Sequence, residues 1–91
     1  MTFEWDESKN AENILKHRAS FAKAQMAFAD PIRVILKDDE HSINEQRFYC
    51  IGNIESRIIT VRFTIRNDNI CIYDAGYWRK QKIIYERKNN L

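Results

Sequence analysis

The chain has 91 residues, of which 44% are hydrophobic and 31% charged, so its length and composition are those of one globular domain over residues 1–91. Two glycines and one proline exclude collagen-like and proline-rich classes, and no apolar run approaches the ~18 residues of a membrane span. The formal net charge is +2, but nine basic and four acidic residues follow Glu45, which favours an anionic partner for the C-terminal half.

The first half of the chain predicts a short strand and two helices. Residues 3–5 alternate between apolar and polar side chains, as an edge strand does. Asp6 is a candidate helix N-cap, and apolar residues at helical spacing follow it up to a turn at residues 17–19. Ser20 is the candidate N-cap of a second helix. The Asp-Pro pair at 30–31 ends this helix, because a residue before proline avoids the helical conformation.

The second half predicts four strands and a third helix. Strands are expected at residues 33–37, 47–51, 57–65 and 70–73, with Gly52 ending the second of them. A helix is expected from about Tyr77 to Lys88. The order β-α-α-β-β-β-β-α predicts an α+β fold, in which a small antiparallel sheet carries two N-terminal helices and one C-terminal helix on one face.

Several kinds of site are excluded by the residues that the chain contains. Cys50 and Cys71 each lie in an apolar run, so we expect reduced core thiols in a cytoplasmic protein, and the acidic N-terminus lacks the features of a secretory signal. The two glycines form no phosphate-binding loop. His17 and His41 do not belong to a ligand-spaced group, so we expect no metal and no cofactor.

Metal-independent cleavage of RNA is the chemistry that the remaining polar residues can perform. Such a reaction needs a base for the 2′-hydroxyl, an acid for the departing 5′-oxygen, and cations for the phosphorane. Histidine and arginine suit these roles. The candidate catalytic residues are His17, His41, Arg62, Arg66, Arg79 and Lys80. The candidate substrate-binding residues are Lys16 and Arg47, with Tyr77 and Trp78 as platforms for unpaired bases.

Each candidate also has a purely structural interpretation, which the sequence leaves open. His17 ends a helix, where a cation stabilises the helix C-terminus. His41 can pair with the acidic residues at 39–40. The strand arginines suit a solvated sheet face, the cations after Trp78 suit the wet side of a helix, and Trp78 itself suits a core.

Short motifs follow one another in a distinctive order along nearly the whole chain. They are Phe3-Glu4-Trp5-Asp6, Lys16-His17, Ser20-Phe21, Phe28-Ala29-Asp30-Pro31, Asp39-Glu40-His41-Ser42, Arg47-Phe48 and Ile51-Gly52. In that order they resemble the BrnT family of toxins from type II toxin–antitoxin systems. The resemblance implies a RelE-like fold and a ribonuclease that cleaves RNA and inhibits translation. It also implies a BrnA-like antitoxin with a ribbon-helix-helix portion, a heterotetramer, and contact with operator DNA through the antitoxin.

The resemblance is incomplete near the end of the chain. Many family members have arginine at the positions of Cys71 and Gly76. Three functions therefore remain open: a nuclease in which Arg79 or Lys80 supplies the missing charge, a catalytically weak or silent antitoxin-binding partner in operon autoregulation, or an RNA-binding domain using the basic helix. The residues that match family positions are Lys16, His17, His41, Glu45, Arg47 and Arg66.

Overall fold

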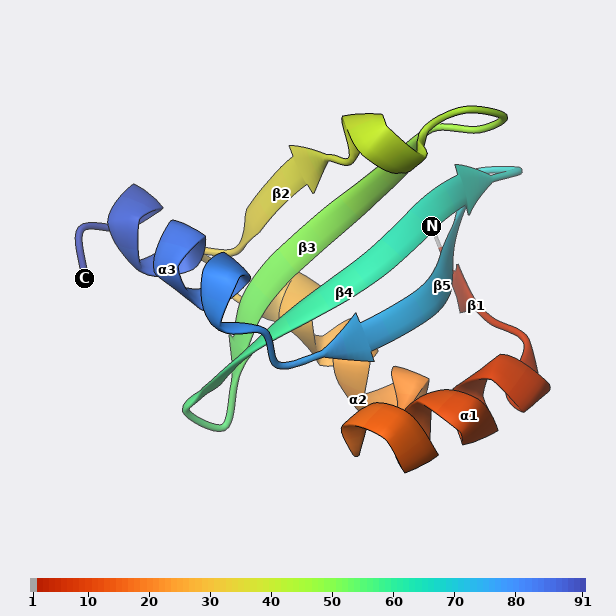
Figure 1. Cartoon of the computed structure of the whole chain (residues 1–91), viewed down its shortest axis with the longest axis horizontal. Helices are drawn as coiled ribbons and strands as arrows, with labels where there is room; N and C mark the ends of the chain where they lie inside the picture. Colours follow the sequence, from red (N-terminus) through yellow and green to blue (C-terminus); the bar gives the residue numbers. More distant parts are fainter. Residues whose placement is uncertain (1) are drawn as a thin grey trace.

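A computed structural model describes residues 2–91 as a five-stranded sheet with three α-helices (Figure 1). The observed element order confirms the predicted one, with two short 3₁₀ turns added. No helix within residues 2–91 has both the length and the apolar character needed to cross a membrane. The elements are β1 (Phe3–Glu4), α1 (Glu7–His17), α2 (Phe21–Ala24), η1 (Gln25–Ala29), β2 (Val34–Lys37), η2 (Asp39–His41), β3 (Arg47–Ile54), β4 (Arg57–Arg66), β5 (Asn69–Gly76) and α3 (Arg79–Lys88).

The sheet is mixed, with strand order β1-β5-β4-β3-β2. Strands β2 to β5 form the antiparallel meander that the short polar connections predicted. β1 is an edge strand, as expected, but it pairs parallel to β5, with Phe3 opposite Ile70 and Glu4 opposite Cys71. The wholly antiparallel sheet is therefore a wrong expectation for this one strand. Residues 5–68 separate β1 from β5, far more than the dozen or so residues that a parallel connection needs.

The helices do not all lie on one face of the sheet, which corrects the prediction. α2 and η1 cover one face, where Phe21 and Ala27 pack with Cys50 and Val61. α3 covers part of the opposite face, where Tyr85 packs with apolar side chains of β2 and β3. Figure 1 shows α3 in front of one end of the sheet and α2 behind it. No helix within the described residues 2–91 covers the rest of the second face, over β3, β4 and β5 (Figure 1).

The predicted N-caps of the first two helices are both confirmed. The Asp6 carboxylate accepts hydrogen bonds from the backbone N–H groups of Ser8 and Lys9, and the Ser20 hydroxyl accepts one from Lys23. These bonds satisfy N–H groups that have no partner within the helix. The second helix is α-helical only over Phe21–Ala24 and continues as the tighter 3₁₀ turn η1.

Gly52 does not end β3, which runs on to Ile54. A Cβ atom at Gly52 would lie 2.6 Å from the carbonyl oxygen of Ala27, so the glycine permits η1 to approach the strand. The chain reverses instead at Glu55 and Ser56, whose φ angles are 51° and 70°. The glycine thus marks a close backbone approach and not a turn.

The C-terminal helix begins at Arg79 and not at Tyr77. Trp78 occupies the N-cap position with extended backbone, and Tyr77 precedes the helix. The ring of Tyr77 packs against the core between the sheet and α2, and the Arg57 guanidinium lies 3.7 Å from the centroid of this ring. These packing contacts hold Tyr77 outside the helix.

Candidate active site

An irregularity in β5 places two consecutive side chains near the uncovered sheet face. Arg62 of β4 pairs with Asp74, and the next β4 residue pairs with Ile72, so Tyr73 has no partner in the β4–β5 register. A bulge of this kind adds one residue to a strand and re-aims its side chains. Tyr73 thereby lies under the guanidinium of Arg47, 4.7 Å from its ring centroid, while Asp74 lies beside Arg62.

The bulge assembles a central cluster, which we define as His17, Arg62, Asp74 and Trp78. One carboxylate oxygen of Asp74 lies 3.8 Å from His17 Nε2, and the other lies 3.7 Å from Arg62 Nε. The Trp78 ring meets the His17 ring edge-on at 5.1 Å, and the Arg62 guanidinium lies 5.5 Å from the Trp78 centroid. A histidine, a carboxylate and an arginine thus converge from α1, β5 and β4.

Two buried donors in this region lack a hydrogen-bond partner within residues 2–91. They are Arg62 Nε and the Tyr73 hydroxyl. Burial raises the pKa of Tyr73, so this hydroxyl stays protonated at neutral pH. Buried polar groups are usually satisfied in folded proteins. Arg62 Nε has the Asp74 carboxylate at 3.7 Å as its nearest charged neighbour, beyond hydrogen-bond distance.

A second group lies along the same face around Glu45. Arg66 donates two hydrogen bonds to the Glu45 carboxylate, from Nε at 3.1 Å and from Nη2 at 2.8 Å, and Arg47 lies 3.9 Å away. The hydrogen bond from Arg66 lowers the pKa of Glu45, and the same bond raises the pKa of Arg66. A fork of this type also fits the oxygens of a phosphate.

These arginines rim a cleft of about 370 Å³, which we call the β1 cleft. The cleft combines cations, carboxylates and two aromatic rings. The β1 cleft adjoins the central cluster, because two of its lining residues, Lys9 and Tyr73, also line a second hollow. That hollow lies beside Lys16, His17 and Asp74. The residues that line the β1 cleft are Glu4, Trp5, Asp6, Lys9, Glu45, Arg47, Thr64, Arg66, Cys71, Ile72 and Tyr73.

His41 lies apart from His17. Its Nδ1 is 2.9 Å from the buried carboxylate of Asp38, not from the neighbouring residues 39–40 that the sequence suggested. It borders a hollow shared with Arg47 and Arg66. The ligand atoms of Asp38, Glu40 and His41 lie within 4.8 Å of one another, so the expectation that His41 belongs to no ligand-spaced group is wrong.

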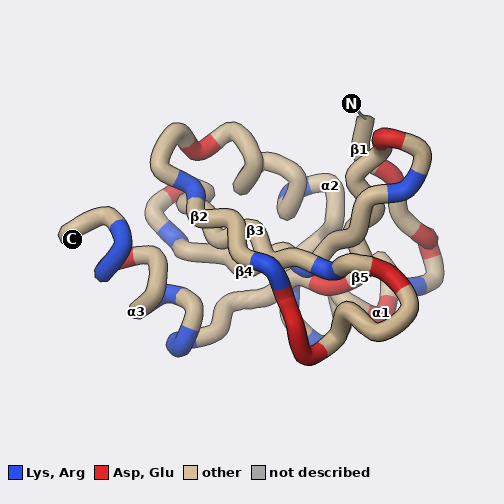
Figure 2. Tube along the Cα trace, turned by 90° about the horizontal axis from the view of Figure 1, so that it is seen from above, with Lys and Arg blue, Asp and Glu red and all other residues tan. Residues whose placement is uncertain are grey.

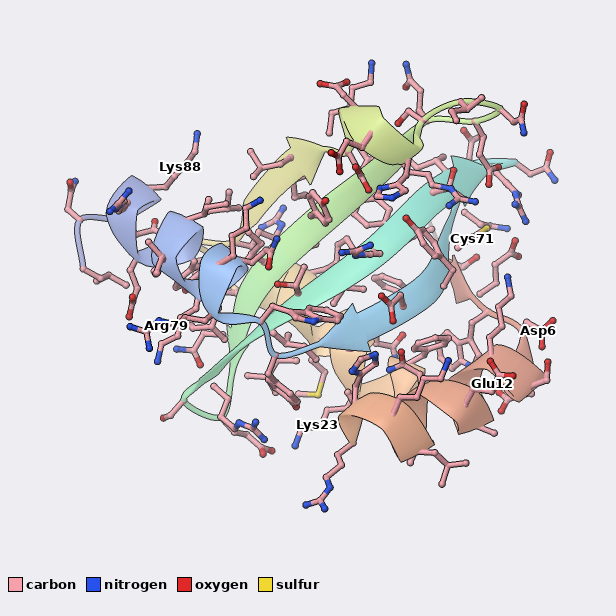
Figure 3. All side chains as sticks on the ribbon, in the orientation of Figure 1. Asp6, Glu12, Lys23, Cys71, Arg79 and Lys88 are labelled. Carbon is pink, nitrogen blue, oxygen red and sulfur yellow. The ribbon has the colours of Figure 1, made fainter. Side chains whose placement is uncertain are left out.

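The cations of α3 lie far from the β1 cleft. Arg79 and Lys80 are exposed in the first turn of α3, and Figure 2 shows basic residues recurring along this helix. Figure 3 places Arg79 and Cys71 at opposite ends of the sheet. Of the two predicted stacking residues, Trp78 joins the central cluster, whereas Tyr77 packs against the core and Arg57. The structure thus does not bring Arg79 to the position of Cys71.

Cys71 and Gly76, the two positions where the resemblance implies arginine, have different surroundings. Cys71 lines the β1 cleft, and burial raises the pKa of its thiol to about 11. Gly76 lies under Trp78, since a Cβ atom there would come within 2.7 Å of the indole ring. In this chain the indole therefore occupies the space directly above position 76.

Sequence reasoning missed Tyr73, Asp74 and the position of Glu45 in the site. The predicted strand ended at Tyr73, which left Asp74 in a connection. No periodicity in the sequence of β5 could have found them, because residues 70–73 are apolar at every position and do not alternate. The interpretation of the strand arginines as residues of a solvated sheet face agrees with the position of Arg62 on the uncovered face.

The fold and site define a small α+β protein with an arginine-rich, open sheet face that carries one histidine. A family model described as "Ribonuclease toxin, BrnT, of type II toxin-antitoxin system" matches residues 5–82, most of the chain. The chain therefore belongs to the BrnT family of ribonuclease toxins, which confirms the resemblance in its motifs and indicates an antitoxin as partner. No curated protein matches the chain. All sequence-predicted site residues fall within the matched range.

Proposed function

We propose that this chain is a metal-independent endoribonuclease that cuts RNA at the central cluster and thereby inhibits translation in the cytoplasm. The observation that carries the proposal is the convergence of His17, Arg62 and Asp74 on one open face, at 3.7 and 3.8 Å. Membership of a ribonuclease toxin family supports the class of activity.

In the proposed reaction, His17 takes the proton of the 2′-hydroxyl or gives a proton to the departing 5′-oxygen, and water carries out the other of these two proton transfers. An imidazole is suited to either step near neutral pH. Arg62 stabilises the charge of the phosphorane through its guanidinium, which Asp74 holds on this face. Asp74 orients both groups, because its two oxygens face the two partners separately. His17 thus serves as the base or acid, Arg62 as the stabilising cation and Asp74 as the positioning group.

The remaining candidates are assigned to the RNA on either side of the cut. Arg47 and Arg66 bind a neighbouring phosphate, for which Glu45 holds them in place. Lys16 adds a cation beside His17, and Trp78 offers an aromatic surface next to Arg62. His41, Arg79 and Lys80 lie further out, so we assign them contacts with the RNA backbone and not with the scissile phosphate.

We further propose that the antitoxin is a BrnA-like ribbon-helix-helix protein that inhibits by covering this face. The cations there suit an acidic segment of the partner. Two copies of each chain would then form a heterotetramer, with operator DNA bound by the antitoxin.

One observation favours a second candidate, a weak or silent nuclease that serves as an antitoxin-binding partner. Of the two positions where the resemblance implies arginine, Cys71 lines the neighbouring β1 cleft, and the indole of Trp78 in the central cluster fills the space above Gly76. In addition, carboxylates already pair with Arg62 and Arg66. A substrate phosphate has to compete with these carboxylates.

Inducible expression of the chain without its antitoxin tests the proposal. We expect growth arrest with cellular RNA fragments, and loss of both in Arg62→Ala and His17→Ala. Lys23→Ala is the matched control, because Lys23 pairs with Glu55 outside the site. Arg79→Ala tests the role of Arg79. If Arg79 is catalytic, as the sequence analysis suggested, cleavage should be lost; if it contacts only the RNA backbone, as proposed here, cleavage should persist. Normal growth and intact RNA from soluble, folded protein would contradict the proposal and support the silent partner.

A further inference from the structure

The β1 cleft offers a nucleotide both a phosphate-binding rim and a flat wall. Lys9, Arg47 and Arg66 contribute the cations, and Trp5 contributes an aromatic surface. The volume of about 370 Å³ lies within the range of small-ligand pockets. The Trp5 indole donates to Glu7 at 2.8 Å and its ring meets Phe21 edge-on at 6.3 Å, so the ring is fixed.

The three carboxylates of the cleft differ in how far they are already engaged. Asp6 caps α1 through two backbone N–H groups, and Glu45 is held by the fork of Arg66. Glu4 is exposed, and among residues 2–91 it accepts hydrogen bonds only from the Cys71 thiol at 2.9 Å and from the Asn69 amide at 3.3 Å. A thiol is a weak donor. Glu4 is therefore the carboxylate that a ligand can recruit at the least cost.

A carboxylate with both oxygens available selects among the four RNA bases. Guanine presents two adjacent N–H donors, at N1 and N2, on its Watson–Crick edge, and they match the two oxygens. Uracil presents one such donor. Adenine and cytosine place a ring-nitrogen acceptor next to the amino group, and this acceptor would face a carboxylate lone pair.

We propose that the β1 cleft is a guanine-selective nucleotide subsite, in which Glu4 binds the base edge while Arg47 and Arg66 hold the phosphate. The position of the cleft supports a role in substrate choice. Lys9 and Tyr73 line both the cleft and the hollow beside His17, so a base in the cleft belongs to a nucleotide next to the one being cut. This last step rests on the proposed RNA cleavage, whereas binding of the base does not.

Binding of uncleavable oligonucleotides tests the subsite directly. The probes are fluorescent 2′-O-methyl pentanucleotides, uracil at every position except the centre, which carries guanine, adenine, cytosine or uracil. Affinity is measured by fluorescence anisotropy. We expect the guanine probe to bind about tenfold more tightly, as good bidentate base contacts discriminate by about that much. Glu4→Gln should remove the preference, and Glu55→Gln, an exposed hairpin carboxylate on Lys23, should keep it.

Glu4→Asp is the second variant, because it keeps the charge but withdraws the acceptor from the cleft. It should also lose the preference for guanine. Equal affinity for the four probes, no measurable binding, or a guanine preference that survives in Glu4→Gln would each overturn the subsite. The guanine preference is measured without cleavage, so its failure is distinguishable from failure of the proposed function. Cleavage without guanine preference overturns only the subsite, and guanine binding without cleavage overturns only the nuclease.

Discussion

Replacing Tyr85 by phenylalanine tests how α3 is fixed to the body of the protein. The side chain of Tyr85 is only 1% exposed, and its hydroxyl donates a 2.6 Å hydrogen bond to Oδ2 of Asp30. The same oxygen accepts from the backbone N–H of Asn53 at 2.7 Å, and Oδ1 accepts from that of Ile32 at 3.0 Å. One buried carboxylate therefore joins α3, β3 and the segment before β2.

The expected loss of stability follows from the nature of this bond. Tyr85→Phe keeps the ring in the core and removes only the hydroxyl. A hydrogen bond to a charged group contributes about 1.5–3 kcal/mol, and its loss leaves the carboxylate one donor short. For a domain of this size each kcal/mol shifts Tm by about 4–8 °C. We therefore expect Tm to fall by roughly 10 °C at pH 7.

The same bond predicts how the effect of Tyr85→Phe depends on pH. Burial raises the pKa of Asp30, but hydrogen bonds from Tyr85 and from two backbone N–H groups lower that pKa by more than burial raises it. The pKa of Asp30 therefore lies below the usual 3.8. The stability that the ionised carboxylate provides is thus complete above that value and is lost as pH falls below it. The difference in stability between wild type and Tyr85→Phe should narrow in this acid range. Burial and Asp30 raise the pKa of Tyr85 to about 12, so the difference should stay constant through neutral pH.

Thermal unfolding followed by circular dichroism, at pH 7 and in steps down to pH 3, measures both effects. Tyr73→Phe is the matched control, because the Tyr73 hydroxyl is buried but has no hydrogen-bond partner within residues 2–91. We expect this control to be neutral or stabilising. The reasoning is refuted if Tyr85→Phe costs no more than Tyr73→Phe, or if the difference from wild type does not change in acid.

Three further variants or reagents probe other parts of the structure. Gly52→Ala should cost about 1–3 kcal/mol in thermal unfolding, since its Cβ would lie 2.6 Å from the Ala27 carbonyl oxygen; an unchanged midpoint would contradict the close approach. Burial raises the pKa of Cys50 and Cys71 to about 12 and about 11. Both thiols should thus react with iodoacetamide at pH 8 much more slowly in native than in urea-unfolded protein, and equal rates would refute their burial. Glu45→Gln frees the two arginines that pair with Glu45, Arg47 and Arg66. The slope of log affinity against log salt concentration for an oligonucleotide should then steepen by about 0.7 for each additional phosphate that they neutralise. An unchanged slope would exclude both arginines from binding.

Local signals in the sequence predicted most of the fold. The alternation in β4 and the N-caps at Asp6 and Ser20 depend on contacts between near neighbours, so they are legible in the chain itself. The errors came from contacts between distant segments. Gly52 suggested a turn, but it serves the approach of η1 to β3. The parallel pairing of β1 and the position of α3 on the second face likewise depend on the whole sheet.

The site was predictable in its residue types and less so in its arrangement. Arg62 and His17 were expected as catalytic candidates, and the structure places both beside Asp74. Asp74 was missed because a bulge, which no periodicity announces, turns it toward them. Arg79 or Lys80 was expected to supply the charge missing at Cys71 and Gly76, and of these two positions Cys71 lies at the opposite end of the sheet from Arg79 (Figure 3).

Cleavage of RNA by the purified chain is the most direct test of the proposed active site. A single-stranded RNA is incubated with the protein in excess EDTA, beside the same strand with 2′-deoxy sugars. The account predicts cleavage of the RNA alone, reduced by about 10²–10³ in Arg62→Ala, as for loss of one transition-state donor, and unchanged in Lys23→Ala. Cleavage that requires a divalent metal, that includes the deoxy strand, or that persists at full rate in Arg62→Ala would contradict it.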